Sequence, residues 1–300
     1  SRSHWLTTCK SRTIGPIIFN WKTSNASNAY WLLVVPLFGL IIALYAWPVI
    51  NILWLGVSDP ELGIQNYKLL FTKSSLAKIL WTTIRVCLIT TLCSVVIGYL
   101  IAYAMVHLVG RERNWMLTLV LISFWVSVLV RAFSWLTLLG RNGLVNAALV
   151  GSGLAEEPIS MIRNEFGVLI GMVHYMVPYA VLPLLANMQG IDHRVMDASR
   201  SLGAGPLLTF VRIYLPLTKP GVIASSLLVF IISLGFYVTP ALLGGGRVLM
   251  VAEYVSVQIL VTVQWGVAAM LATLLLSGVL ALLYIMSRFM KIGEVFGARA

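Results

Sequence analysis

The residues that most often carry chemistry are few in this chain and lie far apart. Its four histidines and three cysteines show no spacing typical of metal ligands. The sequence offers no convincing pair of nucleophile and base, and the GxxxxGK[ST] loop that cradles nucleotide phosphates does not occur. We therefore expect no catalytic residue, no metal site, no bound cofactor and no enzymatic activity in this chain itself.

Ionisable and aromatic side chains inside apolar runs are stronger candidates for a role. Arg131 and His174 lie in such runs, where an ionisable group is costly and usually functional. Arg131 precedes the end of its run at Leu139 by about 12 Å along a helix. The alternatives are a tether from Arg131 to backbone carbonyls, an interhelical hydrogen bond of His174, and ordinary packing of the aromatic rings. We predict that six residues line a substrate route or its gate: Arg131, Trp135, His174, Tyr175, Phe236 and Tyr237.

The polar segment 189–219 has a helical pattern of its own. Apolar and small residues recur at helical spacing up to Leu202, and Gly203-Ala204-Gly205 then breaks the pattern. Pro206 suits the first turn of a second helix, which we expect Pro216 and Pro220 to end. Such a helical pair has apolar residues to bury, either against its own chain or in a groove on a soluble partner.

The elements that position these residues are predicted to be membrane-spanning helices. Of the 300 residues, 59% are hydrophobic and only 10% are charged, against about 25% charged in soluble domains. Apolar runs of about 20 residues can cross a bilayer, where helices satisfy their own backbone groups. The sequence contains six such runs: 30–57, 81–107, 115–139, 166–188, 221–243 and 266–289. The fold class is therefore an all-α integral membrane protein with six transmembrane helices.

A seventh apolar segment, 251–263, is too short to span a bilayer. We interpret it as an amphipathic or re-entrant helix at one mouth of the protein. The alternative is that it extends the sixth spanning helix outward.

The basic residues predict the orientation, since cytoplasmic loops are enriched in Lys and Arg. The net charge is +11, and the basic residues outside the runs divide 13 to 6 between the two sides. The richer side carries both termini and the loops after the second and fourth runs. We expect cytoplasmic tails at 1–29 and 290–300, a transmembrane domain at 30–289, and a cytoplasmic loop at 189–220.

This loop resembles the EAA loop of permeases from binding-protein-dependent ABC importers, of form E-A-A-x3-G-x9-I-x-L-P. Asp for Glu and Ser for the second Ala are mild departures, and every spacing fits. Segments 31–48, 63–71, 130–143, 238–246 and 265–276 also look like the polyamine-type subfamily. The residues that match the loop motif are Asp197, Ala198, Ser199, Gly203, Ile213, Leu215 and Pro216.

The resemblance implies a type I ABC importer permease fold in a bacterial inner membrane. It implies two cytoplasmic ATP-binding subunits that hold ATP and magnesium, with the seven loop residues coupling them to the spans. A second permease subunit, expected to be a different chain, would complete the pathway, and a periplasmic binding protein would deliver the solute. Nucleic acid is not an expected partner.

The substrate is nominally a polyamine, because of the same resemblance. Opines, amino-acid-like solutes and other small organic ions stay open, since the six runs contain no Asp or Glu and include Arg85 and Arg131. Three other classes compete with the importer: an ion-coupled secondary transporter, a membrane enzyme and a membrane scaffold. A secondary transporter would require buried acidic residues and internal repeats, and an enzyme would require a cluster of catalytic residues. A scaffold would have no need of a loop that is broken by glycine.

Overall fold

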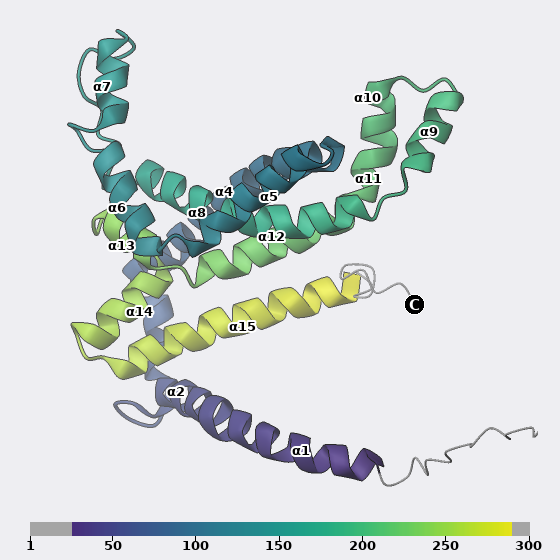
Figure 1. Cartoon of the computed structure of the whole chain (residues 1–300). Coiled ribbons are helices and arrows are strands. Elements are labelled where there is room, and N and C mark those ends of the chain that lie inside the picture. Colours follow the sequence, from purple (N-terminus) through teal and green to yellow (C-terminus); the bar gives the residue numbers. More distant parts are fainter. Residues whose placement is uncertain (1–25, 290–300) are drawn as a thin grey trace, which may run out of the picture. The chain divides into compact units, whose positions relative to one another are not determined.

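The computed structural model describes residues 26–289, and every regular element among them is helical (Figure 1). The predicted tails at 1–29 and 290–300 lie outside these residues, except that 26–29 begin the first helix. The chain divides into two compact units at Asn51, and each is described by itself.

The described part of the first unit is an apolar helical run with a local widening, and its last helix continues along the chain into the second unit. α1 (Ala26–Ile41) passes through the π-helical turn η1 (Ile42–Ala46) into α2 (Trp47–Ser58). In this turn the Trp47 N–H bonds the Ile42 carbonyl, one residue further back than in an α-helix. Pro48 follows directly, and its ring would crowd the preceding turn of a regular α-helix. The first predicted span therefore continues through its prolines.

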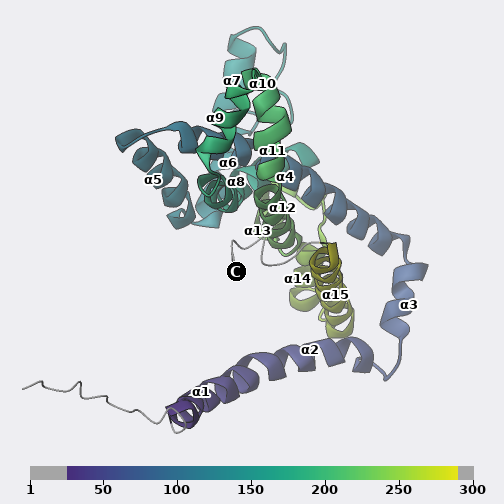
Figure 2. The ribbon, with the colours of Figure 1, turned by 90° about the vertical axis from the view of Figure 1, so that its right-hand side faces the viewer.

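Three long helices form the centre of the second unit: α4 (Ser74–His107), α8 (Glu165–Gln189) and α12 (Lys219–Leu234). α8 packs against both of the others, as the end-on view of α8 and α12 in Figure 2 shows. A Cβ on Gly98 of α4 would lie only 2.8 Å from the Ala180 Cβ of α8. The absence of a side chain at Gly98 thus permits the close approach of the two helices.

The third and fifth predicted spans are broken, contrary to the expectation of continuous helices. α5 (Arg111–Trp125) and α6 (Val128–Leu138) meet at 97°, because Val126 and Ser127 adopt extended conformations. α12 stops before Gly235, and the chain re-enters a helix only at α13 (Val238–Gly244). The distance of about 12 Å between Arg131 and Leu139 is therefore a distance along α6. Because α6 is bent away from α5, this distance does not give the depth of Arg131 in the membrane.

Outside the loop after α8, four further helices belong to the described part of this unit. They are α3 (Gln65–Thr72), α7 (Leu144–Gly151), α14 (Val251–Leu260) and α15 (Trp265–Phe289). A break with a positive φ of 53° at Val263 separates α14 from α15, and the two helices pack together. The segment 251–263 is thus a separate short helix and does not extend the sixth span.

Four helices are long and apolar enough to cross a membrane, in the part of the chain that the structure describes. The number rises to six when two bent pairs are each counted as one span, namely α5 with α6 and the helix 206–217 with α12.

The loop after α8 is a helical hairpin. α9 (His193–Ser201) is followed by the glycine turn and a second run made of α10 (Pro206–Thr209), η2 (Phe210–Tyr214) and α11 (Leu215–Leu217). The second run ends at Leu217, between Pro216 and Pro220 as predicted, and the chain then bends by 56° into α12. The π turn before Pro216 resembles the one before Pro48, and the Leu215 N–H bonds the Phe210 carbonyl.

Candidate functional site

An aromatic cluster lies where the broken third and fifth spans meet α8. Tyr175 of α8 is at its centre, with the Phe236 ring at 4.5 Å and the Tyr179 ring at 5.7 Å between centroids. Phe124, at the end of α5, packs edge-to-face on Tyr179 at 4.9 Å. The breaks bring these rings together, because they redirect α6 and free Phe236 from the end of α12.

Arg131 of α6 lies against this cluster. Its guanidinium carbon is 4.5 Å from the centroid of the Tyr175 ring, in the geometry of a cation–π interaction. Its Nη2 donates a hydrogen bond of 2.7 Å to the Val126 carbonyl, which lies in the break between α5 and α6. The Arg131 Nε is buried without a hydrogen-bond partner. Arg131 therefore tethers the broken backbone and also presents its charge to an aromatic face.

A neutral polar pair lies beside this arginine. The Trp135 indole N–H donates to His174 Nδ1 at 3.1 Å. An indole nitrogen can only donate, so Nδ1 must accept and its proton must be absent. The imidazole is therefore uncharged, with its proton on Nε2, and contributes no positive charge to the cluster.

Five of the six predicted route residues make these contacts, in two groups: Arg131, Tyr175 and Phe236 form one, and Trp135 and His174 form the other. Sequence reasoning missed Phe124 and Tyr179, although Tyr179 follows Tyr175 by one helical turn and could have been inferred from that spacing. Tyr237, the sixth predicted residue, is 48% exposed and makes no aromatic contact within residues 26–289.

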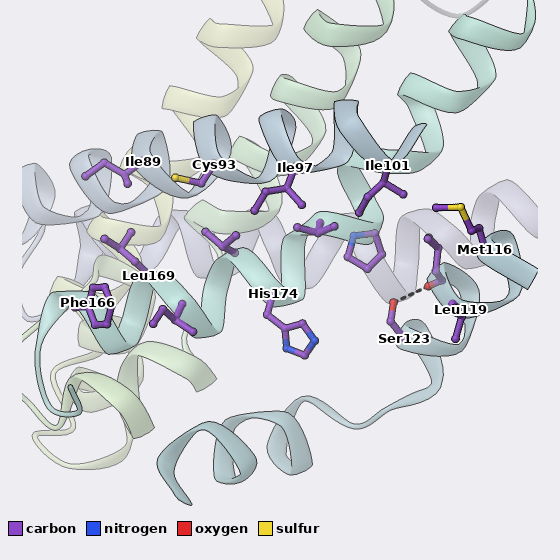
Figure 3. Close-up of a pocket in the computed structure, with 15 residues that line it drawn as sticks. Ile89, Cys93, Ile97, Ile101, Met116, Leu119, Ser123, Phe166, Leu169 and His174 are labelled. Atoms are coloured by element: carbon purple, nitrogen blue, oxygen red, sulfur yellow. Dashed lines mark hydrogen bonds between the residues drawn. The ribbon is translucent and has the colours of Figure 1, made fainter. Parts of the chain in front are cut away.

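An open groove of about 770 Å³ runs along the neighbouring face of α8 (Figure 3). Its walls come from α4, α5 and α8, and they are almost entirely apolar. Cys93, Ser123 and His174 are its polar side chains, and Ser123 bonds the Val120 carbonyl of its own helix. The groove therefore offers apolar contact rather than recognition of a charged group.

The helical hairpin contains the seven residues of the loop motif. Gly203 has φ +84°, a conformation that side chains disfavour, and an added Cβ would meet no atom within 4 Å. Ser199 and Thr209 are buried, and their hydroxyls lie 3.0 Å apart, which joins the two arms of the hairpin. The motif's Ser therefore holds the hairpin together from inside, whereas Asp197 and Ala198 remain exposed.

Apolar side chains on the hairpin remain open to the surroundings. Leu202 at the turn is 89% exposed and Leu207 is 77% exposed, well beyond the usual exposure of leucine. The other exposed apolar residues of the hairpin are Val195, Leu208, Val211, Leu215 and Leu217. The hairpin thus leaves an apolar surface that its own chain does not cover.

Two further ionisable side chains, Arg85 and Glu253, affect the distribution of charge in the second unit. Arg85 of α4 forms an ion pair with Glu165 at the start of α8, so its charge is balanced. Glu253 of α14 is only 7% exposed, and its Oε2 has no hydrogen-bond partner. Burial raises the pKa of the Glu253 carboxyl from 4.5 to about 7.

Comparison with known proteins identifies the family of this chain. The profile of the family described as "Binding-protein-dependent transport system inner membrane component" matches residues 94–291. The spermidine/putrescine transport system permease protein PotB of Haemophilus influenzae is 33% identical over 74% of this chain and 78% of its own length. PotB of Escherichia coli is 32% identical over 69% of this chain and 76% of its own.

A solved structure has the same fold. The crystal structure of a bacterial alginate ABC transporter, in complex with an alginate pentasaccharide-bound periplasmic protein, contains a chain that superposes with a TM-score of 0.71. It shares 16% identity, with 89% of this chain and 95% of that chain covered. The expected ABC importer permease fold is thereby confirmed, and the ion-coupled, enzymatic and scaffold alternatives give way to it. The chain belongs to the family of binding-protein-dependent transport system inner membrane components, and it is a permease subunit of an ABC importer.

Proposed function

We propose that this permease imports a polyamine. Spermidine and putrescine are the solutes in the names of the relatives that match most of the chain. A polyamine carries ammonium groups, which aromatic faces attract when water is largely excluded. The cluster around Tyr175, contributed by α5, α6, α8 and the connection after α12, is the part of the chain that would meet them.

The distribution of charge supports a cationic solute better than the sequence suggested. Arg85 would repel a cation if it were free, but its pairing with Glu165 balances that charge. A route lined by aromatic rings needs no carboxylate to attract ammonium groups, which removes the main objection to a polyamine. An opine or another small organic anion would instead need a positive charge in the route, and the Arg131 guanidinium that could supply one lies against the Tyr175 ring.

We further propose that the helical hairpin is the contact with one of two cytoplasmic ATP-binding subunits, which bind ATP and magnesium and perform hydrolysis. The exposed Leu202 and Leu207 suit an apolar groove on a partner. A second permease subunit would complete the route, and a periplasmic binding protein would supply the solute.

The orientation follows from this contact. The hairpin lies at one end of α8 and α12, and α7 lies at the other (Figure 1). If the hairpin faces the cytoplasm, α7 faces the periplasm, in agreement with the bias of basic residues. Both termini are then cytoplasmic, in a bacterial inner membrane.

Uptake by the assembled complex tests the substrate. The permease is co-expressed with its proposed ATPase, second permease and binding protein, and the complex is reconstituted in proteoliposomes. We expect ATP-dependent accumulation of labelled spermidine that unlabelled putrescine reduces. Competition by an opine or an amino acid, with none by putrescine, would contradict the assignment.

Gly203 tests the coupling role in the same proteoliposomes. Gly203→Asp places a side chain where the described part of this chain has no atom within 4 Å, so a steric clash there must come from a partner, whereas the strain of the positive φ is shared by the control. We expect assembly of the permeases with uptake reduced at least tenfold. Gly153→Asp is the matched control, since Gly153 has φ +73° and the same open surroundings at the other end of the bundle. Equal uptake by the two variants would remove the hairpin from the mechanism.

A further inference from the structure

The position of Arg131 suggests a role beyond lining the route, and this inference rests on the proposed transport of a polyamine. Arg131 places a cation on the face of Tyr175, the ring at the centre of the aromatic cluster. A ring face that holds a guanidinium can also hold an ammonium group, because both are attracted by the same electron-rich surface. Arg131 thus occupies the face of the Tyr175 ring that a transported cation would use.

No carboxylate holds Arg131 in place. Within residues 26–289 the ion pairs are Arg85 with Glu165 and Arg200 with Asp197. Arg131 is kept over the ring by one hydrogen bond to the Val126 carbonyl, and its Nε is unpartnered. These contacts are far fewer than the five donors of a guanidinium can make, so the side chain can be displaced at modest cost.

The groups that lie beside Arg131 in the described part of the chain carry no charge of their own. His174 is held neutral by the Trp135 N–H, and the side chain that the guanidinium contacts is the Tyr175 ring. Two cations a few ångströms apart in a site of low dielectric repel strongly. An ammonium group therefore cannot lie on Tyr175 while Arg131 is there.

We infer that Arg131 is a tethered competitor of the transported cation, which must leave the face of Tyr175 before a polyamine ammonium binds there. In the conformation described, the route is closed to cations at this point. Arg131 acts as a specificity-determining residue: only a cation that gains enough at the aromatic cluster displaces it.

Cysteine protection in the assembled complex tests this inference. The three native cysteines are replaced by alanine, and His174→Cys introduces a thiol beside the cluster at an exposed position. A small neutral methanethiosulfonate reagent labels this thiol, and free spermidine is titrated as the protecting ligand without binding protein. The readout is the spermidine concentration that halves the labelling rate.

Arg131→Met removes the charge and keeps a side chain of moderate length. We expect it to lower the half-protecting concentration at least tenfold relative to the Arg131 background. Arg131→Lys keeps a cation and should protect as the Arg131 background does, and Tyr175→Leu should abolish protection with Arg131→Met.

An unchanged or raised half-protecting concentration in Arg131→Met would overturn the inference and leave Arg131 as a structural tether. Failure of the proposed function is distinguishable from this result. If the reconstituted wild type imports no polyamine, the substrate assignment fails. If it does import polyamine while Arg131→Met leaves protection unaltered, only the competitor role fails.

Discussion

At the scale of single residues, the chain separates charges that are balanced from charges that are not. Arg85 is paired with Glu165, whereas Arg131 relies on a carbonyl and a ring. An unpaired ionisable group in an apolar setting is expensive and usually has a function. That contrast is the reason to place function at Arg131 and a structural role at Arg85.

Glu253 gives a prediction about pH and stability. Its carboxyl has a pKa of about 7 in the folded protein and an ordinary value of 4.5, so between these pH values the folded protein binds more protons than the unfolded one. Its contribution to stability is therefore greatest below about pH 4.5, falls as the pH rises to about 7, and is level above that.

Glu253→Gln should remove this fall, because a carboxamide does not ionise. The measurement is the midpoint of thermal denaturation of the detergent-purified complex at several values from about pH 5 to about pH 8. Glu157→Gln, at an exposed position, is the control and should follow the wild type. A decline in Glu253→Gln parallel to that of the wild type would show that another group is responsible.

The residue types indicated part of the site in advance. Arg131, His174 and Tyr175 could be singled out because polar groups are rare in apolar runs. The contact of Arg131 with the Tyr175 ring could not be predicted, because it depends on the break at Val126 and Ser127, where the sequence has neither proline nor glycine.

At the scale of elements, the long apolar runs predicted the helices but not the π-helical turns beside two of the prolines. Pro48 and Pro216 each follow a π-helical turn within a continuing helical run. A widened turn removes the clash of the proline ring with the preceding backbone, and sequence spacing alone does not reveal it. The hairpin and its glycine turn were predicted correctly, since Gly203 does adopt a positive φ.

The contact between α4 and α8 gives a prediction at this scale. Gly98→Ala would place a Cβ 2.8 Å from Ala180, closer than real Cβ atoms approach, and overpacking of this kind costs about 1–3 kcal/mol. We expect a lower midpoint of thermal denaturation in detergent.

Gly278→Ala is the matched control for this change. Gly278 lies in α15, and an added Cβ there would meet no atom within 4 Å. The replacement should leave the midpoint unchanged or raise it slightly, since alanine favours helix by up to about 1 kcal/mol. Equal midpoints for the two variants would mean that α4 and α8 separate easily at Gly98.

At the scale of the whole second unit, two helices connect the hairpin with the aromatic cluster. α8 carries Tyr175 and leads into the hairpin at Gly190, and α12 starts at the hairpin's bend and ends beside Phe236. A push on the hairpin would therefore move both walls of the cluster as rigid bodies. This connection is how a chain without a nucleotide-binding loop could use the energy of ATP hydrolysis.

Cross-linking from the hairpin turn tests this account most directly. Leu202→Cys is introduced into the cysteine-free complex, where the side chain is 89% exposed, and Leu154→Cys at 79% exposure serves as the control near α7. With a short reagent that couples to this thiol at one end and reacts with any neighbouring residue on illumination at the other, we predict an adduct between position 202 and the ATP-binding subunit, in an amount that changes when ATP is added, and none from position 154. A complex that imports its solute yet joins position 154, and not position 202, to the ATP-binding subunit would contradict the account.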